Sequence, residues 1–242
     1  MSSPLHQFEI KTLIHLPKLA GFDVSFTNSS LAMVVSVVMT LLLTSFAARK
    51  QALIPSRLQS AGELFYSFVH SLVTDTAGKN AAPCFPLVFS LFAFIMFGNL
   101  FGMFPFAFTF TSHIIVTFVL AMVVFLFVTA LGFAKHGLHF FRLFAPHGVP
   151  WYVLLLLIPI EIFSYCMRPV TMSLRLFANM MAGHIVLKVI IAMTISAGVT
   201  FAIFPFALSL AIIAFEFFIA CVQAYIFSLL TCVYIKDALE LH

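Results

Sequence analysis

Residues 80–134 contain no aspartate, glutamate, lysine or arginine. A soluble domain carries about 25% charged residues, so an uncharged run of this length does not suit a surface that faces water. The run is also far longer than the roughly 20 apolar residues that cross a bilayer as a single helix. Pro105 and the polar segment 109–113 interrupt it. We therefore predict a transmembrane hairpin, with one helix over 86–107 and a second over 113–133.

The rest of the chain has the same character, with 63% hydrophobic and 8% charged residues among 242. So little polar surface predicts an all-α polytopic membrane protein, forming a single membrane domain over 1–242. The strands of a transmembrane β-barrel would alternate polar and apolar residues in segments of about ten, whereas the apolar runs here are continuous. The net charge of +4 lies at segment ends. It indicates membrane topology, and we expect no nucleic-acid partner.

The basic residues predict the orientation of the chain. The first apolar run is predicted to be a transmembrane helix over 30–48, and Arg49 and Lys50 follow it directly. Basic residues mark the cytoplasmic side of a span, so segment 1–29, which lacks the order of a signal peptide, is predicted to lie outside. The hairpin ends in a second basic cluster within 135–150, an interfacial connection that agrees with this orientation. The C-terminus is predicted to lie inside.

Segment 55–80 mixes charged and apolar residues. Apolar side chains recur at helical spacing among Arg57, Glu63 and Asp75, which is the pattern of an amphipathic helix. Pro55 is suited to open such a helix. We predict a helix here that either lies at the inner membrane interface or packs against the rest of the protein.

Two long apolar segments, 151–196 and 200–236, complete the chain. A continuous helix of about 40 residues is about 60 Å long, twice the roughly 30 Å thickness of the hydrocarbon layer. Either each segment breaks into two spans or each lies steeply tilted. Pro159 and Pro169 in the first segment, and Pro205 in the second, are candidate positions for a kink.

Nearly all ionisable side chains within apolar segments belong to these last two. They are Glu161, Arg168, Arg175, His184, Lys188 and Glu216. The first three predicted spans have no acidic residue, lysine or arginine in their interiors. A charged side chain at the bilayer centre costs roughly 2.5–3.5 kcal/mol on insertion scales, so such residues mark ion pathways or proton relays by default. Arginine cannot avoid this cost by losing its proton.

Helical geometry arranges these groups on two polar faces. At about 100° per residue, four polar side chains of the first segment fall on one stripe. They are Glu161, Arg168, Arg175 and Asn179. His184 lies about half a turn away from Arg175 on the same helix. In the second segment, Glu216 and Gln223 are seven residues apart and share a face.

Each of these side chains also has a structural explanation when taken singly. Arg175 and Glu216 would form an ion pair, long cationic side chains would snorkel, and amides or His184 would join helices by hydrogen bonds. Six ionisable groups confined to two helices favour an ion pathway over a structural anchor. The sequence has no Walker A, G-x-G-x-x-G or H-E-x-x-H motif, so we predict no nucleotide site, cofactor or metal in this chain.

The segment 171–180, with the sequence TMSLRLFANM, resembles the signature of subunit a of F-type ATP synthase. Further segments along nearly the whole chain are similar to that family. They are His6–Ile10, Phe26–Ser29, Phe97–Gly102, Pro159–Glu161, Ala182–His184 and Tyr234–Ala238. This resemblance implies a non-catalytic stator subunit, whose two long segments form a tilted antiparallel hairpin beside a ring of c subunits.

The resemblance also implies a role for six residues of two aqueous half-channels. Arg175 matches the essential arginine that faces the ring carboxylate. Glu161 matches a carboxylate of the inner half-channel. His184 and Glu216 match a pair in the outer half-channel, with the two residue types exchanged relative to many bacterial members, as in mitochondrial and alphaproteobacterial ones. Asn179 and Gln223 match polar lining residues. Arg168 and Lys188 match no known role.

The partners and location implied by the resemblance follow from these roles. They are the c-ring, b-type peripheral stalk subunits, the other ATP synthase subunits, membrane lipid and protons as the transported ion. The location is a bacterial inner membrane, with the mitochondrial inner membrane as the alternative. A self-contained secondary transporter is a second possible function. It would be expected to show inverted repeats, and the sequence has no convincing one.

Overall fold

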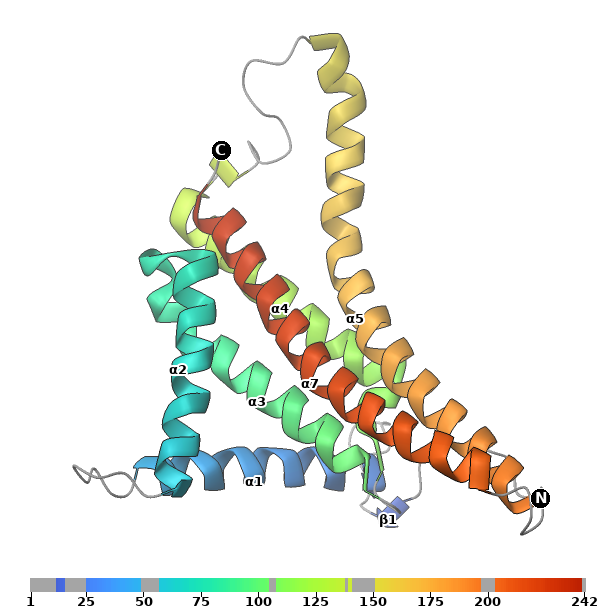
Figure 1. Ribbon diagram of the computed structural model, residues 1–242. Helices are drawn as coiled ribbons and strands as arrows, with labels where there is room; N and C mark the ends of the chain where they lie inside the picture. The colour runs from blue at the N-terminus through green and yellow to red at the C-terminus, as the bar shows by residue number, and fades with distance from the viewer. Residues whose placement is uncertain are drawn as a thin grey trace.

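The computed structural model describes residues 12–15, 25–48, 57–104, 108–137, 139–140, 151–196 and 203–240. Within these ranges, five helices are long and apolar enough to cross a membrane. The all-α polytopic class is thereby confirmed (Figure 1). The main helices are α1 (Asn28–Ala48), α2 (Arg57–Ala77), α3 (Phe85–Gly102), α4 (Ile114–His136), α5 (Trp151–Ser196) and α7 (Ile203–Leu239).

Short elements connect or precede the helices. Strands β1 (Thr12–Ile14) and β2 (Phe26–Thr27) pair antiparallel, and 3₁₀-helices η2 (Lys79–Cys84) and η3 (Phe110–Ser112) precede α3 and α4. Thr27 caps α1, because its Oγ1 accepts a hydrogen bond from the Ser30 amide at 3.3 Å. Helix α4 ends at His136, and its C-cap residue Gly137 has a φ of 56°, in the region that favours glycine.

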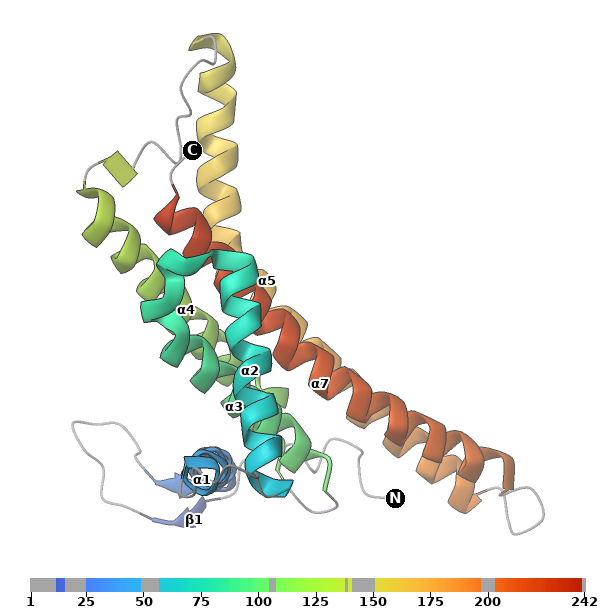
Figure 2. The same cartoon turned by 60° about the vertical axis from the view of Figure 1, so that its left-hand side comes forward.

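Helices α2, α3, α4 and α7 enclose the main apolar core together with the middle of α5. Helix α2 stands beside α3 (Figure 2), and it buries Val69 and Val73. The amphipathic pattern of the sequence therefore forms a helix with a packed face. That α2 lies at the inner membrane interface remains a prediction.

A close contact holds η3 against α3. A Cβ atom on Gly98 would lie 2.3 Å from Cζ of Phe110, so only glycine admits the phenylalanine ring at this place. Phe110 is fully buried there. This packing holds η3 against α3, and with it the neighbouring residue Thr109.

Helices α5 and α7 are each continuous, over 46 and 37 residues. Neither breaks into two helices. At 1.5 Å per residue, α5 is therefore roughly 70 Å long. Helix α5 contains Pro159 and Pro169. Its first third bends away from the remainder, and the rest runs side by side with α7 (Figures 1 and 2). Their tilt relative to the membrane remains a prediction.

Candidate functional site

His184 on α5 and Glu216 on α7 form a buried pair where the two long helices pack together. His184 Nδ1 lies 3.1 Å from Glu216 Oε1, and the residues are 5% and 3% exposed. Among the described residues no donor makes an in-line hydrogen bond to this oxygen, so the contact is a close approach between titratable atoms. A Cβ on Gly183 would lie 3.0 Å from the same oxygen, and glycine therefore leaves room for the carboxyl group.

Thr109 extends this pair toward the α3–α4 turn. Its Oγ1 lies 3.0 Å from His184 Nε2, and it also donates a hydrogen bond to the Gly102 carbonyl at 3.0 Å. Thr109 is 2% exposed. Sequence reasoning missed this residue. The polar interruption at 109–113 within the uncharged run was the available signal, but it indicated a turn and not a site.

Arg175 lies on a different part of α5 and is exposed. It forms no ion pair with any residue in the described ranges, and the possible Arg175–Glu216 pair is not found there. Leu176 and Met180 on α5 are fully buried in the core. The helix therefore presents its apolar face to the protein and the guanidinium outward.

One helical turn from Arg175, an amide pair joins the two long helices. Asn179 Nδ2 donates a hydrogen bond of 2.8 Å to Oε1 of Gln223. Asn179 is exposed and Gln223 is 2% exposed. Asn99 of α3 lies on the other side of α7, where its Nδ2 donates to the Ala220 carbonyl at 3.3 Å. Polar side chains therefore lie on or beside α7 from Glu216 to Gln223.

Glu161 and Arg168 lie nearer the start of α5. Glu161 is partly exposed and forms no ion pair within the described part of the chain. Arg168 binds Asp237 at the end of α7, with an Nη1–Oδ2 distance of 3.1 Å. Its Cζ lies 5.2 Å from the Tyr165 ring centroid and 4.8 Å from that of Tyr234. No role of Arg168 was predicted from the sequence, and in the structure it forms a clamp between α5 and α7.

We expect this clamp to stabilise the packing of α5 on α7. Arg168→Gln should lower the free energy of unfolding by about 1–2 kcal/mol, combining a partly exposed ion pair with cation–π contacts. Asp237→Asn should cost less, because Asp237 is screened by water. Thermal unfolding of the detergent-solubilised chain, followed by labelling of buried Cys84 and Cys232, measures both variants and their double mutant. Strictly additive losses would contradict the clamp.

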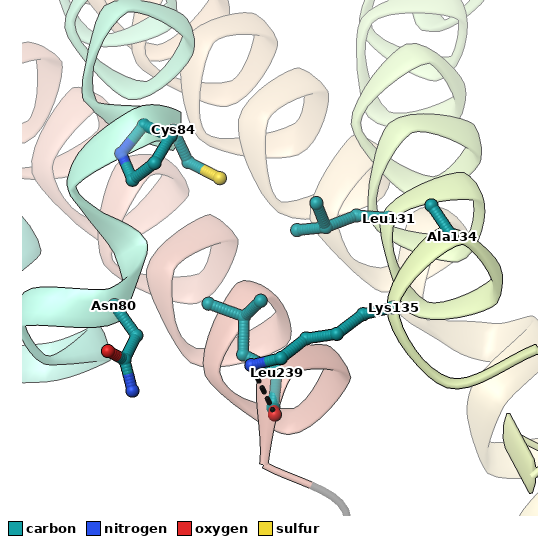
Figure 3. Close-up of a pocket in the computed structure, with 7 residues that line it drawn as sticks. Asn80, Cys84, Leu131, Ala134, Lys135 and Leu239 are labelled. Atoms are coloured by element: carbon teal, nitrogen blue, oxygen red, sulfur yellow. Dashed lines mark hydrogen bonds between the residues drawn. The ribbon is translucent and has the colours of Figure 1, made fainter.

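A cavity of about 500 Å³ lies at the end of α7, between η2 and the end of α4. Asn80, Cys84, Leu131 and Lys135 are among the residues that line it (Figure 3). Lys135 Nζ donates a hydrogen bond of 3.1 Å to the Leu239 carbonyl, which satisfies an acceptor at the end of α7. None of the site residues predicted from sequence lines this cavity.

Comparisons with known proteins identify the family of the chain. The family model described as ATP synthase A chain matches residues 30–236. The chain is similar to ATP synthase subunit a of Rhodospirillum rubrum, with 50% identity over 242 residues and full coverage of both chains. It is 48% identical to that of Pelagibacter ubique, covering 100% of this chain and 99% of the relative. On this similarity over its full length, the chain belongs to the ATP synthase A chain family.

Proposed function

We propose that this chain is the proton-conducting stator subunit of an F-type ATP synthase in a bacterial inner membrane. Membership of the family supports a multi-pass subunit of the membrane sector that works with other ATP synthase subunits. The observation that carries the finer proposal is the contrast between two polar places on the long helices. The His184–Glu216 pair is buried between them, whereas Arg175 is exposed and has no ion-pair partner in the described chain.

The buried pair suits transfer of a proton from the outer half-channel. Glu216 and His184 both bind and release protons, and their contacting atoms are 3.1 Å apart. They would pass a proton to a carboxylate of the c-ring. Once neutral, that carboxyl group can turn into the lipid, because the cost of desolvating its charge is removed.

Arg175 suits release of the proton after the ring has turned. A fixed positive charge stabilises the ionised form of a nearby carboxylate, so the ring carboxyl group would lose its proton as it approaches Arg175. The inner half-channel with Glu161 would receive this proton. The same charge would block a direct path for protons between the half-channels. Each proton that crosses 100 mV supplies about 2.3 kcal/mol.

The surface beside Arg175 suits the approach of another helix. Thr171, Ala178 and Ala182 share its face of α5 and are exposed. Small side chains let two helices in a membrane approach closely, which would bring a ring carboxylate within reach of the guanidinium. We propose the c-ring as the occupant of this surface and b-type subunits as further partners. The proposed orientation has the N-terminus outside and the C-terminus inside.

The proposal is tested by comparing the chain alone with the assembled membrane sector. The purified chain in liposomes should conduct no protons above the background of empty vesicles, because the path requires the ring carboxylate. The chain purified together with an oligomeric proteolipid ring should conduct under an imposed membrane potential. Vesicles with the ring alone are the control. Equal transport by the chain alone would contradict this proposal and favour the self-contained transporter.

A further inference from the structure

We propose that Thr109 is a positioning residue that holds neutral His184 as the tautomer with its hydrogen on Nε2, so that the lone pair of Nδ1 can accept a proton from Glu216. This inference rests on the proposed function, because it assigns a role within the outer proton path. It concerns a residue of the α3–α4 turn, outside the two long helices that carry the other proposed site residues.

The assignment follows from counting hydrogens. A threonine hydroxyl has one hydrogen to donate and lone pairs to accept with. Thr109 Oγ1 lies 3.0 Å from the Gly102 carbonyl oxygen, which can only accept. The hydroxyl hydrogen is therefore directed to this carbonyl. The second contact of Oγ1, to His184 Nε2 at 3.0 Å, then requires a hydrogen on Nε2.

The surroundings hold the hydroxyl group in this orientation. The Gly102 carbonyl is at the end of α3, where the last four carbonyls have no partner within the helix. A Cβ on Gly102 would lie 2.5 Å from Thr109 Oγ1, so the close approach depends on glycine. Ser112 Oγ donates a hydrogen bond of 2.6 Å to the Thr109 carbonyl. Donation to Nε2 instead would take the hydroxyl hydrogen away from a buried carbonyl, which is unfavourable.

The consequence for proton transfer lies at Nδ1. With the hydrogen on Nε2, neutral His184 has a lone pair on Nδ1, 3.1 Å from Glu216 Oε1. Once its O–H bond is brought into line with this lone pair, a protonated Glu216 can transfer its proton: the O–H bond breaks, an N–H bond forms, and a carboxylate faces an imidazolium. The step reverses without another reactant. The opposite neutral tautomer has its hydrogen on Nδ1, and this atom cannot accept a proton.

The test uses the intact ATP synthase reconstituted in liposomes, with two changes at one position. Thr109→Val keeps the side-chain shape and removes the hydroxyl, whereas Thr109→Ser keeps the hydroxyl. We expect Thr109→Val to lower passive proton conduction at least roughly tenfold, part of the ~10²–10⁴-fold that a positioned proton-transfer group contributes. Thr109→Ser should restore conduction to within about twofold of the unmodified protein, because the positioned hydroxyl remains.

Thr117→Val is the matched control. Thr117 is also a buried threonine, with hydrogen bonds to the Ile114 carbonyl and to Ser173 Oγ on α5, at 3.0 and 3.1 Å. Thr117 has the same side chain and burial as Thr109 but no contact with His184. We expect the ATP synthase with Thr117→Val to conduct protons at the normal rate. A loss equal to that of Thr109→Val would attribute both losses to packing and overturn the proposal.

A spectroscopic measurement tests the proposal without relying on rates of proton conduction. ¹⁵N NMR of the complex labelled at histidine distinguishes the two ring nitrogens. The signals of His184 are those that are missing from the spectrum of His184→Gln. The unmodified protein should show neutral His184 protonated on Nε2, and Thr109→Val should show a mixture of tautomers. An Nδ1-protonated ring in the unmodified protein would overturn the proposal even where Thr109→Val fails to assemble.

One further variant separates this inference from the proposed function. Normal conduction by Glu216→Gln would refute the proposed route itself, and with it the role of Thr109. Blocked conduction by Glu216→Gln together with normal conduction by Thr109→Val would refute only the positioning role.

Discussion

Replacing Arg175 by alanine is expected to abolish ATP-driven proton pumping while the ATP synthase still assembles. The exposed guanidinium has no ion-pair partner within the described chain, so its removal leaves the fold without a buried unpaired charge. The proposed partner is the ring carboxylate. Without a fixed positive charge nearby, this carboxyl group would keep its proton as it passes, and rotation would no longer drive release. Quenching of a pH-sensitive dye in inverted vesicles measures pumping, and immunoblots of the purified complex measure assembly.

Lys236→Ala is the control for loss of a positive charge as such. Lys236 is an exposed cation in the last turn of α7. It shares the charge of Arg175 but lies away from the proposed contact with the ring. Pumping should persist in Lys236→Ala, and it should also persist in part in Arg175→Lys, which keeps the charge. Undiminished pumping by Arg175→Ala would exclude the proposed role.

The helices could be predicted from sequence because the bilayer imposes their length. Long apolar runs, broken by Pro105 and by polar turns, indicated the transmembrane hairpin, and the structure contains α3 and α4 in this region. Hydropathy did not decide whether the last two segments were broken or continuous. Proline removes a single hydrogen bond, and packing against neighbours decides whether a helix continues through it. Helix α5 continues through Pro159 and Pro169.

The site could be predicted only in part, because helical periodicity gives the face of each residue but not how two helices meet. His184 was predicted to face away from Arg175, and Glu216 belonged to another helix. Their contact depends on the rotation of α5 against α7, which packing of residues such as Leu176 and Ala220 determines. Before the structure, only the resemblance to subunit a indicated that His184 and Glu216 form a pair.

Thr109 and Asp237 were beyond prediction for a different reason. Threonine is common in apolar helices, where its hydroxyl usually bonds to its own backbone, and nothing in the sequence connects it to His184, 75 residues away. Asp237 follows exposed Lys236, and it was considered only as part of Tyr234–Ala238, a segment similar to subunit a. Its ion pair with Arg168 becomes visible only when the end of α7 lies beside α5.

Glu216→Gln is expected to slow passive proton conduction by roughly 10²-fold, the range for loss of a positioned acid–base group. Glutamine has nearly the same shape and remains polar, but it does not exchange a proton with His184. Glu216 is 3% exposed, so bulk water has little access to its carboxyl group. The rate is measured in reconstituted membrane sector as acidification after a potassium diffusion potential is imposed.

Gln223→Ala is the comparison that makes this result specific to proton exchange. Gln223 is also buried on α7, and its loss removes the hydrogen bond from Asn179. A neutral hydrogen bond contributes about 0.5–1.5 kcal/mol, so this variant should lower conduction only a few-fold, through local geometry or stability. Losses of the same size in Glu216→Gln and Gln223→Ala would mean that both residues serve packing, and that the proton takes another route past α7.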